Sequence, residues 1–165
     1  KEQLKAILCN SINKKNMETK TNIRYKIHSI AENCCILNID KINVSDINEE
    51  SLRFQYKIET LIKMSENIIL VTPSIRFILG DTTILEVSAT ISYDVQTLDE
   101  AFAVDKENHK INIKADILPS FVGASYSTLR GIVYAKTAGT PLAQYPIPMI
   151  EIPTLMNKNA ISVED

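Results

Sequence analysis

The segment 118–156 restricts the possible folds of this chain more than any other part of the sequence. Large apolar residues recur every three or four positions between Pro119 and Lys136, which predicts a helix with one buried face. That face consists of Phe121, Val122, Tyr126, Leu129, Ile132 and Val133. Pro119 suits a first helical turn, and Gly139 followed by Pro141 suits the end of the helix. We therefore expect a long helix that is followed by a proline-spaced apolar tail.

A second stripe of the same helix carries almost no side chain. It consists of Ser120, Ala124, Ser127, Gly131 and Ala135. A glycine inside a helix costs roughly 1 kcal/mol relative to alanine, so its presence suggests a compensating close contact. That contact is with the chain's own sheet or with another subunit, and we predict that the stripe is an oligomer interface.

Extended segments precede this helix. Apolar and polar residues alternate most clearly from Leu85 to Val95, and shorter alternating runs lie in 23–39, 53–59 and 69–77. Gly80-Asp81 indicates a tight hairpin turn, and Pro73 indicates a bulge or an edge because it cannot donate a ladder hydrogen bond. The predicted fold is α+β: a four-stranded antiparallel sheet with the long helix and a short last helix packed on one face.

The 165 residues suit one main domain. An apolar stripe through Leu4, Ile7, Leu8 and Ile12 predicts an amphipathic helix, so residues 1–20 are expected to form an N-terminal appendage. Residues 21–156 are predicted to form the single α+β domain, and residues 157–165 a flexible tail.

Composition argues against several classes of function. A formal charge of −2, with both signs spread along the chain, gives no basic surface for nucleic acid. No segment reaches the roughly 20 apolar residues of a membrane span. Cys9, Cys34 and Cys35 are odd in number and poorly spaced for a disulfide or a metal site, so we expect reduced thiols and a cytoplasmic protein.

We expect no enzymatic activity and no cofactor. His28 and His109 lack a nucleophile or carboxylate pattern around them, and no glycine-rich phosphate loop is present. Asp105, Glu107 and His109 alternate with lysines, which indicates a surface turn rather than a metal site.

The chain from about Ile23 to Met156 resembles one known family, and the specific part of the resemblance is its last third. The pieces are the Leu118-Pro119 step, the helix to Lys136, the turn 138–141, and the segment 142–146 that leads into Met149–Met156. In this order they resemble the SecB-type protein-export chaperones and their smaller SecB-like relatives. The resemblance implies an ATP-independent chaperone, or holdase, that binds unfolded polypeptides and assembles as a dimer or a dimer of dimers, up to a tetramer.

By the same resemblance, clients would bind an apolar groove between the sheet and the segment after the long helix. The candidates are Ile47, Phe54, Tyr56, Leu142, Tyr145, Pro146, Ile147, Met149 and Ile150. Lys136–Gly139 stands where export members carry an Arg-Gly-Gly-like turn, so docking on the translocase motor is doubtful and a dedicated client such as an antitoxin is an equal alternative. A module that binds a small hydrophobic ligand, or one dedicated protein partner, is the other interpretation.

Overall fold

The computed structural model describes residues 23–38, 40, 47, 50–105, 110–113 and 117–164, with the side chains of 103–105 and 110–113 excepted. The helix expected at 1–20, and His109, lie outside the described residues. The elements are β1 (Tyr25–Leu37), β2 (Leu52–Lys63), β3 (Ile68–Leu79), β4 (Thr82–Val95), α1 (Leu98–Ala101), β5 (Phe102–Asp105), β6 (Lys110–Ile113), α2 (Leu118–Thr137), the 3-10 turn η3 (Pro141–Gln144), α3 (Ile152–Asn157) and β7 (Asn159–Glu164).

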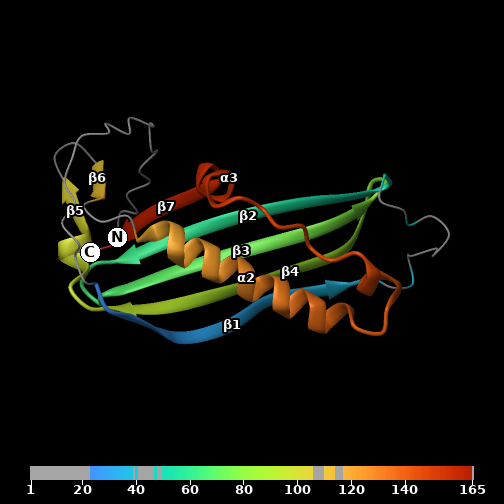
Figure 1. Ribbon diagram of the computed structural model, residues 1–165, viewed down its shortest axis with the longest axis horizontal. Coiled ribbons are helices and arrows are strands. Elements are labelled where there is room, and N and C mark those ends of the chain that lie inside the picture. The colour runs from blue at the N-terminus through green and yellow to red at the C-terminus, as the bar shows by residue number, and fades with distance from the viewer. Residues whose placement is uncertain are drawn as a thin grey trace.

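Five strands form the main sheet, in the order β1-β4-β3-β2-β7 (Figure 1). β1, β4, β3 and β2 pair antiparallel with one another in that order, while β7 pairs parallel with β2. The α+β class is confirmed, but the prediction of a four-stranded, purely antiparallel sheet is wrong. Residues 159–164, expected within a flexible tail, supply the additional strand because their backbone groups complete the hydrogen-bond ladder at the edge of β2.

The strands form because apolar residues recur at every second position and therefore share one face. On β4 the side chains of Leu85, Val87, Ala89, Ile91 and Tyr93 are at most 1% exposed. β3 and β4 are joined at Gly80, whose φ of +61° is a conformation that glycine adopts without strain. The tight hairpin that Gly80-Asp81 predicts is present.

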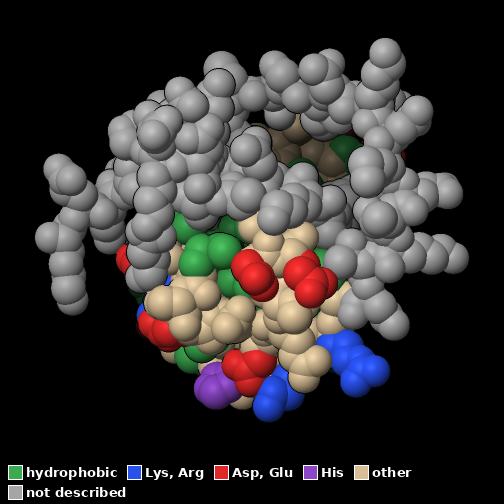
Figure 2. Space-filling view, turned by 90° about the vertical axis from the view of Figure 1, so that its left-hand side faces the viewer, with side chains coloured by type: hydrophobic (Ala, Val, Ile, Leu, Met, Phe, Trp, Pro, Cys, Tyr) green, Lys and Arg blue, Asp and Glu red, His purple; other side chains and the backbone are tan. Residues whose placement is uncertain are grey.

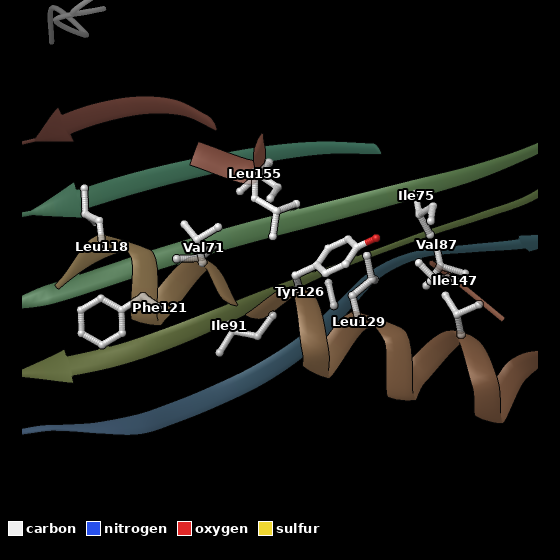
Figure 3. Close-up of a cluster of buried hydrophobic side chains, with 14 of the residues drawn as sticks. Val71, Ile75, Val87, Ile91, Leu118, Phe121, Tyr126, Leu129, Ile147 and Leu155 are labelled. Carbon is white, nitrogen blue, oxygen red and sulfur yellow. The ribbon is translucent and has the colours of Figure 1, made fainter. Parts of the chain in front are cut away.

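α2 lies across the same face of the sheet (Figure 1) and spans the predicted helix. Its apolar residues pack on β3 and β4, as Figure 3 shows for Phe121, Tyr126 and Leu129 beside Val71 and Ile91. One buried polar pair joins α2 to the sheet: the Tyr93 hydroxyl lies 2.8 Å from Ser125 Oγ.

The chain after α2 returns along this face of the sheet towards α3 (Figure 1). Gly139, at φ +78°, ends the turn after the helix, and Pro141 begins η3. The short last helix predicted after the proline-spaced segment is α3, whose Leu155 is buried on the core. α2, the return segment and α3 thus form one layer over one face of the sheet.

Candidate functional site

The proline-spaced segment, residues 145–150, is half anchored and half exposed. Pro146 and Pro148 favour an extended backbone, which keeps this segment from forming a helix. Ile147 is 4% exposed and lies beside Ile75 and Val87 in the core (Figure 3), whereas Met149 is 84% exposed. The segment therefore presents apolar side chains to solvent from a backbone that the core holds in place.

Two tyrosine hydroxyls anchor this segment. Tyr126 on α2 donates a hydrogen bond to the carbonyl of Pro148 at 3.3 Å, and Tyr145 donates to the carbonyl of Ile47 at 2.9 Å. Burial raises the pKa of Tyr126 to about 12, so its phenol remains a donor at neutral pH. The fixed backbone reduces the entropy that a bound partner would cost.

Aromatic side chains of β2 lie on the same face of the sheet. Phe54 is half-buried and meets Phe77 edge to face, with ring centroids 4.7 Å apart. Tyr56 is also half-buried, and its ring lies edge to face with that of Tyr126, with ring centroids 6.4 Å apart. Lys158 Nζ lies 4.5 Å from the centre of the Tyr56 ring. These rings offer large apolar area that needs little further ordering on binding.

The nine predicted groove residues divide between core and surface. Ile47, Leu142 and Ile147 belong to the core, where each is at most 6% exposed. The other six keep accessible surface: Phe54, Tyr56, Tyr145 and Ile150 are half-buried, and Pro146 and Met149 are exposed. We call these six residues the apolar rim, and their role in binding stays a prediction.

The small-residue stripe faces solvent, since all five of its residues are exposed. Packing of the stripe against the chain's own sheet is therefore wrong. A Cβ atom added at Gly131 would meet nothing within 4 Å in this chain, so nothing described explains why a glycine is needed there. Assignment of the stripe to a contact between subunits stays a prediction.

An exposed apolar row on β1 was not predicted. Tyr25, Ile27 and Ile30 share the helix-bearing face of the sheet, yet each is about half exposed. The Tyr25 ring meets Phe121 edge to face at 4.7 Å, and Glu32 pairs with Lys136 at 2.9 Å, so β1 contacts α2 near both ends of the helix. The alternation of residues 23–28 signals the strand, but it does not signal that this strand lies at an edge.

The one described histidine takes part in a surface ion-pair cluster on the other face of the sheet. His28 Nδ1 lies 3.1 Å from the Asp94 carboxylate, and Lys26 Nζ lies 3.2 Å from it. Figure 2 shows acidic and basic side chains beside a histidine at this end of the molecule. Burial pushes the pKa of Asp94 up, but the hydrogen bonds from His28 and Lys26 outweigh it and hold that pKa below its ordinary value. His28 thus contributes to a surface contact with Asp94.

Within the described ranges, no group of three or more His, Cys, Asp or Glu side chains could hold a metal ion. No helix of that part of the chain is long and apolar enough to cross a membrane.

Comparison with known proteins finds similarity among solved structures. No family model matches the chain, and no curated protein matches it. Among solved structures, the fold is similar to that of the Mycobacterium tuberculosis SecB-like chaperone Rv1957, solved in complex with a ChAD peptide from the Rv1956 HigA1 antitoxin. The match has a TM-score of 0.48 and 11% sequence identity, and it covers 77% of this chain and 91% of that chain.

Proposed function

We propose that the protein is an ATP-independent holdase that binds non-native polypeptides on the apolar rim. The observation that carries this proposal is Met149, which is 84% exposed on a backbone fixed by its buried neighbour Ile147. Covering one large apolar side chain is worth about 1.5–3 kcal/mol, which favours a partner that buries it.

The chemistry of the rim suits extended, variable partners. Methionine adapts its shape to different side chains, and the tyrosine and phenylalanine rings add area at low entropy cost. A rim of this kind recognises apolar character rather than one fixed surface. A holdase that works by this burial alone needs no nucleotide.

The packing of α2 favours this function over a module for a small hydrophobic ligand. A ligand cavity would lie between the sheet and the long helix, where the inward side chains of α2 instead contact the sheet directly (Figure 3). Phe121, Val122 and Leu129 are each 0% exposed. The accessible apolar surface lies beside this packed layer and suits a polypeptide lying across it.

We further propose a dedicated or general non-native client in a reducing cytoplasm rather than delivery to a translocase. The turn 136–139 lacks the Arg-Gly-Gly-like pattern of export members, while Cys34 and Cys35 are free thiols. The working form would be a dimer or a dimer of dimers joined through the small-residue stripe.

The test is suppression of aggregation of several unrelated refolding polypeptides, followed by light scattering without ATP. We expect the wild type to suppress scattering and Met149→Asp to bind clients about tenfold more weakly or worse, because a charge in a covered apolar surface is costly to desolvate. Met149→Leu is the matched control, since it keeps an apolar side chain of similar size. Combining Tyr145→Asp with Met149→Asp should weaken binding further.

Circular dichroism of each variant controls for folding. A folded wild type that protects none of the clients would contradict the holdase function. Equal protection by Met149→Asp and Met149→Leu would instead contradict the assignment of the rim.

A further inference from the structure

β7 occupies only part of the edge on which it lies. It pairs with residues 58–63 of β2, whereas β2 begins at Leu52. None of the β7 side chains is fully buried, although the β2 residues that face the core beside it, Ile58, Thr60 and Ile62, are at most 1% exposed. β7 is also the one strand of the main sheet that pairs parallel, a pairing slightly less stable per residue than antiparallel. It is therefore weakly held compared with its neighbours.

One hydrogen bond shows which backbone groups of β7 point towards β2. Met64 N–H donates to the carbonyl of Glu164 at 2.9 Å, so Glu164 directs its backbone towards β2. Because this direction alternates along a strand, Ser162 also faces β2, and the backbones of Ile161 and Val163 face away. The Ser162 hydroxyl, 3.4 Å from the carbonyl of Thr60, agrees with this arrangement.

The same alternation continues along β2 beyond β7. The pairing of β2 with β3 runs without a register shift from Leu52 to Lys63, so Phe54 and Tyr56 direct their backbone groups towards the same edge as Ile62. No other strand of the described part pairs with β2 there. The edge that β7 half covers thus continues past the two aromatic residues of the apolar rim.

The start of β7 fits this edge imperfectly. The Asn159 side chain accepts a hydrogen bond from Thr60 Oγ1 at 3.0 Å, but its buried Nδ2 has no hydrogen-bond partner in the described part of the chain. A buried unpaired donor carries a desolvation penalty. A strand with an apolar residue at this position would avoid that penalty and compete well with β7.

We propose that the edge of β2 from Leu52 to Lys63 is a docking site for an extended client strand, and that β7 is a displaceable occupant of its second half. The proposal rests on the holdase function and names the partner's chemistry: an extended polypeptide with apolar side chains at every second position. Ile161 and Val163, which are partly buried on the core, occupy the places that such side chains take. Main-chain hydrogen bonds give affinity in this mode whatever the client's sequence.

The test compares Ser162→Pro with Ser162→Ala in the full chain. Proline removes the N–H that Ser162 directs at β2, whereas alanine keeps it and loses only the hydroxyl contact. Release of β7 is measured as faster hydrogen exchange at the Met64 amide, and affinity as the fluorescence anisotropy of a labelled, permanently unfolded polypeptide. We expect Ser162→Pro to bind this probe at least about fivefold more tightly than the wild type, because the probe no longer competes with β7. Ser162→Ala should match the wild type.

Val163→Asp offers a second route to the same release, since it places a charge where an apolar side chain packs on the core. Unchanged or weaker probe binding in a folded variant whose Met64 amide exchanges faster would overturn the proposal. So would unchanged exchange at Met64 in both variants, because β7 would then not be displaceable. A wild type that binds no unfolded probe, by contrast, contradicts the holdase function itself.

Discussion

The two edges of the main sheet are built differently. β1 is 13 residues long, pairs antiparallel with β4 along its length, and has two register shifts that bend it, at Ile27/Ser29 and Glu32/Cys34. β7 has six residues and pairs parallel with half of β2. A long edge strand with exposed apolar side chains invites pairing with another chain, whereas a short strand covers an edge.

The residues near each edge extend this contrast. β1 carries the exposed Tyr25, Ile27 and Ile30 and contacts α2, whose outward stripe is made of small residues. The β7 edge continues instead into the aromatic residues of β2 and the proline-spaced segment. On the proposals above, the β1 side would receive a second subunit and the β2 side a client, so the two edges would take different partners.

The largest expected effect tests how firmly each edge is packed. Ile62→Ala on β2, where the side chain is 0% exposed, should lower the free energy of unfolding by about 2–4 kcal/mol. Ile30→Ala on β1, where the side chain is 51% exposed, should lower it by less than about 1 kcal/mol. Urea denaturation at several protein concentrations measures both.

Each variant tests the comparison. The small Ile30→Ala cost applies to separated subunits, so a cost that grows with protein concentration would show that β1 is covered in the assembly and would sharpen the comparison. A cost below about 1 kcal/mol for Ile62→Ala would show that the β2 edge is not part of the packed core.

The next effect concerns the small-residue stripe. Gly131→Leu should weaken self-association by about 1–3 kcal/mol because the larger side chain overpacks a close contact between subunits. Within one chain a Cβ at position 131 meets nothing, so Gly131→Ala should stabilise α2 by roughly 1 kcal/mol when the subunits are apart. Light scattering after size exclusion measures the mass of both variants. A wild type that is monomeric at tens of micromolar would contradict the interface.

The sequence predicts elements well where the local pattern is strong. Pro119 and Gly139 correctly mark the two ends of the long helix. The alternation of Leu85–Val95 correctly predicts β4 and its buried apolar face. Both succeed because the periodicity and the special backbone residues act within a few positions. The outward direction of the small-residue stripe follows in turn, since the large residues bury the opposite face of the helix.

The sequence fails where the outcome depends on distant partners. Ile161 and Val163 alternate too briefly to predict a strand, and only the open edge of β2, about 100 positions earlier, makes them one. Pro73 suggests a bulge or an edge, but it lies in the central strand β3, where the pairing with β4 skips it. Ile147 is equally ambiguous, because a proline-spaced apolar residue can line a groove or fill the core, and here it fills the core.

The smallest expected effect is a pH dependence of stability that arises on the β2 side of the core. Tyr126 lies on the β2 side of the core, where burial raises its pKa from 10.0 to about 12. Its neutral form is favoured in the folded state, so the stability it contributes is complete below pH 10 and is lost as the pH rises towards 12. Tyr126→Phe should cost about 0.5–1.5 kcal/mol at neutral pH, through loss of the bond to Pro148, and should flatten the decline above pH 10.

Tyr93 provides the comparison for this experiment, because it lies on β4, paired with Ile27 of β1, and its pKa is also raised by burial. Its hydroxyl bonds to Ser125 rather than to the proline-spaced segment. Tyr93→Phe should therefore also flatten the alkaline decline but leave client binding unchanged, whereas Tyr126→Phe should weaken client binding because it frees the backbone at Pro148. Urea denaturation between pH 7 and 11 measures stability, and anisotropy of the unfolded probe at pH 7 measures binding. Equal binding by the two variants would mean that the Tyr126 anchor does not organise the apolar rim.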